Sequence, residues 1–311
     1  MADVKKIATR DSYGKALAEL GAQYDNLVVL DADLAGATKT AVFQKAFPAR
    51  HFDCGIAESN MMSVAAGLAA TGLVPFASSF AMFAAGRAFE QVRNSIGYPH
   101  LNVKIGATHG GISVGEDGAS HQCCEDYALM RSIPGMVVMS PADDVEARAM
   151  VKAAYLHEGP VYMRFGRSGI PVFHDESYNF QIGKGEIVKD GTDIAIIANG
   201  LMVYEAMVAA EELKEAGIDA MVINMATVKP LDEDLVLEAA KKCGKIVTAE
   251  EHSVIGGLGE AVAAVLSEKL PTPMKRVGVQ DVFGQSGPAA EVLKYYGLCA
   301  ENIVNVAKSM L

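Results

Sequence analysis

Hydrophobic and polar positions divide the chain into short apolar runs and longer amphipathic stretches, which alternate. The short runs are typical of buried strands, and the longer stretches are typical of helices. In the first half we expect strands at 26–34, 73–80, 102–110, 136–143 and 160–166, and helices at 59–71, 88–96 and 144–156. Buried strands separated by helices are typical of a mostly parallel sheet that helices cover on both faces.

The alternation stops in a polar stretch that contains Gly and Pro and has no sustained period, as is typical of a connection between domains. It then resumes, with strands expected at 193–200, 219–228, 245–252 and 275–281 and helices at 201–217, 232–244, 259–270 and 288–297. We therefore predict an α/β protein of two domains, each a mostly parallel sheet flanked by helices. The predicted parts are a first domain at 1–175, a linker at 176–192 and a second domain at 193–311.

Length and charge restrict the classes of partner. At 311 residues the chain is long enough for two domains. Lys and Arg number 27 against 38 Asp and Glu, and the net charge of −11 argues against a broad nucleic-acid surface. The five cysteines are scattered, and the N-terminal sequence has no apolar secretory segment. These features favour a cytoplasmic protein without a disulfide framework.

One uncharged run, 59–86, is long enough to suggest a membrane span, because about 20 apolar residues cross a bilayer. The run is rich in Ala, Ser and Gly, however, and Pro75 interrupts it in the middle. A buried helix, a turn and a buried strand explain this pattern better, so we expect no membrane segment here.

A single acid, Glu58, stands immediately before this run, at the expected start of a helix that is apolar on nearly every face and therefore buried. Two interpretations remain open at this point. The helix dipole alone stabilises an acid in this place by about 0.3–1 kcal/mol. Alternatively, apolar surroundings raise the pKa of the Glu58 carboxyl, so that it keeps or shares a proton near neutral pH.

Further polar residues gather in the glycine-rich segment 107–126, directly after an expected strand. Ligands of open α/β sheets bind beyond the carboxyl ends of the strands, and glycine lets the backbone approach a ligand closely. The segment concentrates His109, Glu116, Asp117 and His121. Zinc is disfavoured, because the adjacent pair Cys123 and Cys124 matches no usual ligand spacing. We expect no metal bound by the side chains of this chain.

Two arginines and two aromatic residues are further candidates. Arg10 lies before the first expected helix, and Arg167 follows the strand at 160–166. A guanidinium group in such a place can clamp a phosphate with two hydrogen bonds, although isolated arginines are more often surface ion-pair partners. Phe80 and Phe83 are explained by core packing, but an aromatic ring beside a cleft also stacks on a flat heterocycle.

Taken together, these segments resemble the transketolase family of thiamine diphosphate enzymes over almost the whole chain. In the first half the resemblance rests on "DADLAGAT", "GIAESNM", "FASSFAMF", "THGGISVGEDGASHQ" and "GPVYMRFGRSG". In the second half it rests on "AEEHSVIGGLGEAV" and "DVFGQSGPAAEVLKYYGL". The resemblance implies that the first domain is the family's pyrimidine-binding domain and the second its C-terminal domain.

The resemblance also implies a role for each candidate residue. Glu58 corresponds to the acid that hydrogen-bonds N1′ of the aminopyrimidine and favours the imino tautomer, whose neighbouring nitrogen removes the thiazolium C2 proton. The implied cofactor contacts are Glu58, Phe80, Phe83, Asp33 and Ile56. The implied substrate contacts are Arg10, His109 and Arg167 at a sugar phosphate and Asp117 and His121 at hydroxyl groups, and the expected catalytic residues are Glu58, His109 and His121.

Two departures from the family pattern concern the substrate end of the site and the aromatic segment. The family's phosphate-binding serine falls at Ala37, with Thr38 next to it. After Phe83 the sequence "AAGRAF" differs in length from the family pattern.

Family members also bind Mg²⁺ (or Ca²⁺) and the diphosphate through a G-D-G motif in an earlier domain, and this chain contains no such motif. The resemblance therefore implies the second subunit of a split transketolase, with a partner subunit that holds the metal and the diphosphate. Family members pair two active sites across a dimer, so we expect two copies of each subunit.

The implied reaction is transfer of a two-carbon ketol unit between phosphorylated sugars. Deoxyxylulose phosphate synthases and the beta subunits of 2-oxo acid dehydrogenases share the architecture, and a non-catalytic scaffold subunit is a further alternative. The presence of both His109 and His121 favours a transketolase over the two related enzymes. A scaffold has no need of these histidines together with Glu58 and Asp117.

Overall fold

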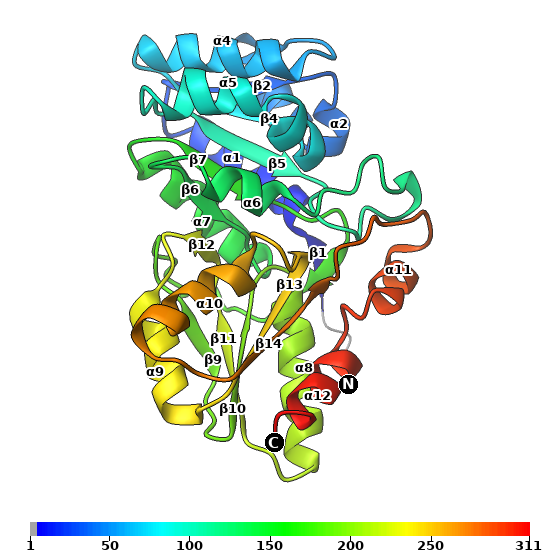
Figure 1. Cartoon of the computed structure of the whole chain (residues 1–311). Coiled ribbons are helices and arrows are strands. Elements are labelled where there is room, and N and C mark those ends of the chain that lie inside the picture. The colour runs from blue at the N-terminus through cyan, green and yellow to red at the C-terminus, as the bar shows by residue number, and fades with distance from the viewer. Residues whose placement is uncertain (1–4) are drawn as a thin grey trace.

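The first domain is built on a seven-stranded sheet with the order β12-β6-β7-β5-β4-β2-β3 (Figure 1). The computed structural model describes residues 5–311, so the first four residues of the predicted first domain lie outside the described part. The strands are β2 (Leu27–Asp31), β3 (His51–Asp53), β4 (Val74–Phe80), β5 (Lys104–Thr108), β6 (Val137–Met139), β7 (Val161–Arg164) and β12 (Thr227–Lys229). All neighbours are parallel except β12 and β6.

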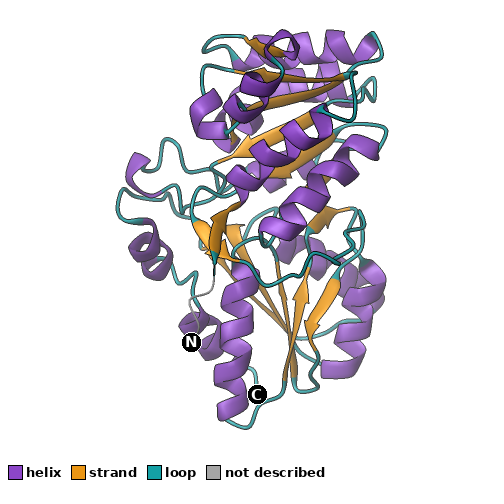
Figure 2. Cartoon of the chain, turned by 180° about the vertical axis from the view of Figure 1, so that it is seen from behind, coloured by secondary structure: helices purple, strands orange, loops and turns teal. Residues whose placement is uncertain are grey.

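Helices cover both faces of this sheet (Figure 2). They are α1 (Thr9–Gly21), α2 (Ala35–Thr38), α3 (Ala41–Ala46), α4 (Glu58–Ala70), α5 (Phe89–Gln91), α6 (Asp126–Arg131) and α7 (Asp144–Leu156). Because neither face meets water, β2, β4 and β5 are buried at every position. The uncharged run forms α4, a turn and β4, as predicted. Across residues 5–311 the structure contains no helix with the length and apolar character of a membrane span.

Two π-helical segments, Met82–Arg87 and Val92–Gly97, flank the short helix α5. A π-helical turn closes its hydrogen bonds one residue later than an α-helical turn and often lies near a functional site. The first of the two overlaps the start of "AAGRAF", where the sequence differs in length from the family pattern.

The second domain carries a five-stranded sheet with the order β14-β13-β10-β11-β9. Its strands are β9 (Glu186–Lys189), β10 (Ile194–Ala198), β11 (Ala220–Asn224), β13 (Ile246–Ser253) and β14 (Met274–Val279). The helices are α8 (Met202–Glu215), α9 (Glu233–Cys243), α10 (Leu258–Lys269), α11 (Ala289–Tyr295) and α12 (Ala300–Lys308). Only β9 runs antiparallel to its neighbour in this sheet.

Two expectations differ from this architecture. The predicted linker 176–192 is not irregular throughout, because β9 lies inside it and forms an edge of the second sheet. The single strand expected at 219–228 is two strands, β11 in the second sheet and β12 in the first. The division falls at Met225 and Ala226: the Met225 N–H donates to Ala198 of the second sheet, whereas the Ala226 carbonyl accepts from Ser140, next to the first sheet. The chain thus crosses between the sheets within a continuous apolar run.

Candidate active site

The candidate residues gather at the carboxyl ends of parallel strands in the first sheet. Phe80 is the last residue of β4, His109 directly follows β5, and Arg167 lies shortly after β7. Glu58 begins helix α4, which follows β3. Because parallel strands end at the same edge of a sheet, residues far apart in sequence meet there.

Glu58 is buried, with 1% of its surface exposed. Its Oε2 accepts a hydrogen bond of 2.9 Å from Nη1 of Arg87, whose side chain is half exposed. Sequence reasoning missed Arg87. The available signal was that Arg87 is the first charged residue after the run 59–86, and a buried carboxylate requires a partner of opposite charge.

Phe80 and Phe83 form a nearly parallel pair, with ring centroids 5.9 Å apart and planes at 15°. His121 meets both rings edge-on, at centroid distances of 6.3 Å from Phe80 and 5.3 Å from Phe83. The Arg87 guanidinium that binds Glu58 lies 4.5 Å from the Phe83 ring centroid. Arg87 thus connects the nearly parallel rings to the buried carboxylate, and such a combination suits a flat heterocycle with a hydrogen-bonding nitrogen.

His109 is 2% exposed and stacks on Phe80, with ring centroids 3.8 Å apart. Its Nε2 lies 2.9 Å from Nη1 of Arg10, and its Nδ1 lies 2.9 Å from Oγ1 of Thr108. Arginine only donates, so Nε2 accepts and Nδ1 carries the hydrogen of the neutral ring. Burial and the positive charges of Arg10 and Arg167 lower the pKa of His109 to about 3. The ring is therefore neutral at physiological pH.

The positive charges of Arg10, Arg167 and Lys39 each lower the pKa of His109, and Arg10 also contacts the ring directly. The antiparallel pair β1 (Lys6–Ala8) and β8 (Gly169–Pro171) brings the two arginines together, because Arg10 follows β1 and Arg167 precedes β8. Arg167 also donates to Glu116 Oε2 at 2.9 Å. Lys39 and Arg167 line one open groove of about 640 Å³. Lys39 was not expected from the sequence.

Thr38 does not replace the missing serine beside this groove. It is fully buried, and its Oγ1 donates to Oδ2 of Asp31 at 2.7 Å. The Ala37 carbonyl instead accepts a hydrogen bond of 3.2 Å from Nη1 of Arg10. This part of the chain therefore helps to position a cation and does not present a hydroxyl group.

The remaining candidates lie on exposed turns around the cluster. Asp117 ends a 3₁₀ turn at Gly115–Asp117, and Asp33 adopts a left-handed conformation with φ of 61°. Ile56 is 76% exposed. In the described residues 5–311, no side-chain hydrogen bond or ion pair joins Asp33 or Asp117 to Glu58 or His109. Their roles, and that of Ile56, stay predictions.

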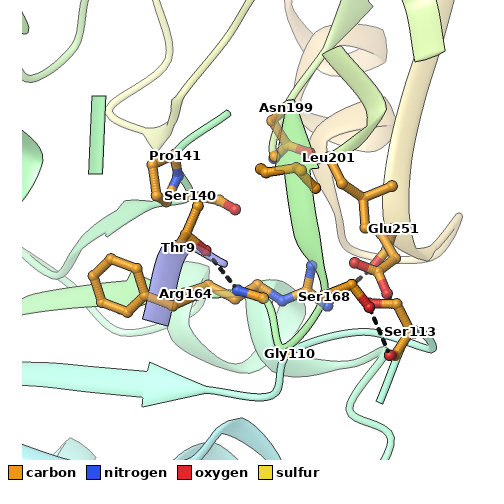
Figure 3. Close-up of a pocket in the computed structure, with 14 residues that line it drawn as sticks. Thr9, Gly110, Ser113, Ser140, Pro141, Arg164, Ser168, Asn199, Leu201 and Glu251 are labelled. Carbon is orange, nitrogen blue, oxygen red and sulfur yellow. Dashed lines mark hydrogen bonds between the residues drawn. The ribbon is translucent and has the colours of Figure 1, made fainter. Parts of the chain in front are cut away.

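A small cavity lies between the two domains and shares no lining residue with the aromatic cluster (Figure 3). Its volume is about 20 Å³, enough for about one water molecule. Two of its buried polar atoms, Ser113 Oγ and Asn199 Nδ2, have no hydrogen-bond partner among the described residues 5–311. The cavity suits a bound water and not a substrate. From residue 5 to residue 311 there is no group of three His, Cys, Asp or Glu side chains that could hold a metal ion.

The fold and the cluster together define a two-domain α/β chain with a place for a flat heterocycle and, next to it, for an anionic group. The transketolase pyrimidine-binding domain family matches residues 5–172, and the transketolase C-terminal domain family matches residues 183–303. The chain belongs to the transketolase family.

Similar proteins and structures carry related descriptions. A Methanocaldococcus jannaschii protein described as a transketolase C-terminal section is 54% identical over 297 residues, which cover 94% of this chain and 93% of that protein. The 6-deoxy-6-sulfo-D-fructose transketolase subunit of a Clostridium species is 45% identical and covers 96% of this chain and 92% of its own length. A solved split-gene transketolase, an inactive β4 tetramer, is 55% identical with a TM-score of 0.91 and covers 97% of this chain and 98% of its own.

Proposed function

We propose that this chain is one subunit of a split transketolase and that, with its partner, it transfers a two-carbon ketol unit between phosphorylated sugars. The observation that carries this proposal is the buried carboxyl of Glu58, which Arg87 connects to the nearly parallel rings of Phe83 and Phe80. Support also comes from relatives that are named as transketolase subunits or sections and match nearly their whole length.

The residues present fit thiamine diphosphate. Phe80 and Phe83 offer stacking surfaces to a pyrimidine ring, and Glu58 offers a carboxyl oxygen to a ring nitrogen in a place closed to water. Asp33 and Ile56 would complete the contacts of this chain with the cofactor. When bound, thiamine diphosphate supplies the reactive carbon that carries the ketol unit. Glu58 holds or moves the proton at the pyrimidine nitrogen, and the aromatic rings fix the plane of the heterocycle.

The substrate end follows from the charges around His109. Arg10 and Arg167, with His109 and Lys39, would hold an anionic terminal group, because guanidinium groups bind such groups with paired hydrogen bonds. Asp117 would bind the hydroxyl next to the ketose carbonyl. His121, which faces both phenylalanine rings, would bind sugar hydroxyls and move protons as the carbon–carbon bond breaks and forms.

The partner would be a second subunit with the G-D-G motif, which would bind Mg²⁺ (or Ca²⁺) and the diphosphate. We propose two copies of each subunit in the cytoplasm. Two observations support the need for a partner subunit: the sequence of this chain contains no G-D-G, and the similar split-gene transketolase described as a β4 tetramer is described as inactive.

Glu58→Gln in the reconstituted pair tests the proposal. The amide keeps the size of the side chain and an acceptor for Arg87, but it cannot share a proton, so turnover should fall by roughly 10²–10⁴-fold. Glu19→Gln, an exposed acid on α1, is the matched control and should leave turnover unchanged. Turnover of Glu58→Gln near the wild-type rate would disprove the catalytic role.

The same pair should be assayed with xylulose 5-phosphate and with pyruvate as donors. Ketol transfer should need both subunits and the sugar phosphate. Strong activity of this chain alone would contradict the split site, and a preference for pyruvate would instead indicate one of the related decarboxylating enzymes.

A further inference from the structure

The loop that joins β5 to α6, residues 109–125, leaves the first domain and packs against the second. Ile112 in this loop is fully buried in the hydrophobic core of the second domain, together with Val292 and Leu298. The Ser113 N–H donates to Oε1 of Glu251 on β13 at 2.6 Å. Figure 1 shows this loop side by side with the segment that leads from β14 to α11. The loop that carries Asp117 and His121 is thus a contact surface between the domains.

One side chain joins the loop to that segment. Gln122 directly follows His121 and is 4% exposed. Its Nε2 donates two hydrogen bonds of 3.0 Å, one to the carbonyl of Ile112 in the same loop and one to the carbonyl of Gln285 in the second domain. A buried amide that bridges two backbone carbonyls fixes the distance between the two chain segments that carry them.

The two segments approach each other closely at a glycine on each side. A Cβ on Gly284 would lie 1.8 Å from Oε1 of Gln122, and a Cβ on Gly118 would lie 2.4 Å from Oγ of Ser286. Gly118 also has a φ of 73°, which disfavours other residues. A further hydrogen bond fixes the segment between β14 and α11, because the Tyr296 hydroxyl donates to the Phe283 carbonyl at 3.0 Å.

From these contacts we propose that residues 282–289 of the C-terminal domain order the loop that carries Asp117 and His121, and that Gln122 is a positioning residue for substrate binding. The proposal rests on the proposed function and adds to it a role for the C-terminal domain. Among residues 5–311, the side chain of Gln122 hydrogen-bonds to Ile112 and Gln285 and to no residue of α4 or β4. Its effect therefore concerns the substrate end of the site and not the pyrimidine end.

Gln122→Glu is the sharpest test, since it keeps the shape of the side chain and replaces the donor with a carboxylate that faces two carbonyl oxygens. Gln285→Ala is the matched control, because it removes an exposed amide and leaves the backbone acceptor in place. In the purified chain, amide hydrogen exchange across 112–122 should become about tenfold faster in Gln122→Glu and stay unchanged in Gln285→Ala. Exchange in α4 should not change in either variant.

Kinetics of the reconstituted pair provide the second measurement. In Gln122→Glu the KM for the sugar phosphate should rise about tenfold, while the dissociation constant of thiamine diphosphate changes less than about twofold. Gly284→Ala should act in the same direction through the displaced Gln122. The inference is overturned if exchange across 112–122 keeps its wild-type rate in Gln122→Glu and Gly284→Ala. It is also overturned if exchange becomes faster in these two variants while the KM for the sugar phosphate stays at the wild-type value. Absence of ketol transfer in the wild-type pair would refute the proposed function instead, and the exchange measurement would still decide whether the segment orders the loop.

Discussion

His109→Ala is the most informative perturbation of the proposed substrate end. The side chain is buried between the ring of Phe80 and the guanidinium of Arg10. It is neutral, because burial and the neighbouring cations lower its pKa to about 3. Its removal therefore takes away an acceptor and a stacking surface and leaves the net charge of the site unchanged at neutral pH.

The size of the effect follows from the two contacts. A hydrogen bond that involves a charged group contributes about 1.5–3 kcal/mol, and here Arg10 donates to Nε2 at 2.9 Å. Loss of this bond frees Arg10 to move away from the position that binds an anionic group. Since about 1.4 kcal/mol corresponds to a tenfold change, the KM for a phosphorylated acceptor should rise by roughly 10–100-fold. The stack on Phe80 adds about 0.5–1.5 kcal/mol, so the affinity for the cofactor should fall by no more than about tenfold.

The assay compares wild type, His109→Ala and His109→Gln in the reconstituted pair, with acceptor KM and thiamine diphosphate affinity measured separately. His109→Gln keeps an acceptor near the place of Nε2 and should recover most of the lost acceptor affinity. Because the pKa of His109 is about 3, the wild-type KM should show no titration of this ring between about pH 5 and 9. An unchanged acceptor KM in His109→Ala, or an equal loss for acceptor and cofactor, would refute the reasoning.

Two buried basic groups away from this site should give opposite dependences of stability on pH. Burial lowers the pKa of His174, but the carboxylates of Asp143 and Glu186 raise it to about 10. Protonated His174 therefore stabilises the folded chain fully below the unfolded pKa of about 6.5, and this stabilisation is lost as the pH rises to about 10. The wild-type free energy of unfolding should thus fall by on the order of 2 kcal/mol between about pH 7 and 9 because of this group, and His174→Gln should not show that fall. Burial lowers the pKa of Lys104 to about 7, so the unfolded chain binds this proton more tightly than the folded chain does. The free energy of unfolding of the wild type should therefore rise between about pH 7 and 10 because of this group, and Lys104→Met should not show that rise. Denaturant unfolding across this range measures both, and a variant that keeps the wild-type pH profile contradicts the assignment for that residue.

The alternation of apolar runs and amphipathic helices was sufficient to predict two α/β domains, because strands buried on both faces leave a strong sequence pattern. It was not sufficient for β12, which adds to the first sheet from within the second half of the chain. The apolar run that contains β11 and β12 is continuous, and only tertiary hydrogen bonds decide where it divides. The three-residue strands β1 and β8 are too short to leave a pattern of their own.

The candidate site was predictable where a residue stands at the end of a strand, as Phe80, His109 and Arg167 do. Side chains that contact these residues from other helices and loops could not be predicted in the same way. Arg87 reaches Glu58 across 29 positions, and Lys39 acts on His109 from the loop after α2. The sequence shows that a buried acid needs a counter-ion, but it does not show which arginine provides one.

The charged residues differ between the two ends of the candidate site. A continuous series of contacts leads from Glu58 through Arg87, Phe83, Phe80 and His109 to Arg10. The ion pair of Glu58 and Arg87 therefore lies at one end of the aromatic cluster, and Arg10 lies at the other. Because Arg87 and Glu58 balance each other, a substrate with one anionic terminal group should be attracted mainly to the end that carries Arg10. Its opposite, reacting end should then lie toward the proposed pyrimidine site. The sign of the charge alone does not separate a phosphate from the sulfonate that the name of one relative implies. A phosphate carries about two negative charges at neutral pH and a sulfonate one, so added salt should weaken the binding of a sugar phosphate more steeply than that of a sugar sulfonate.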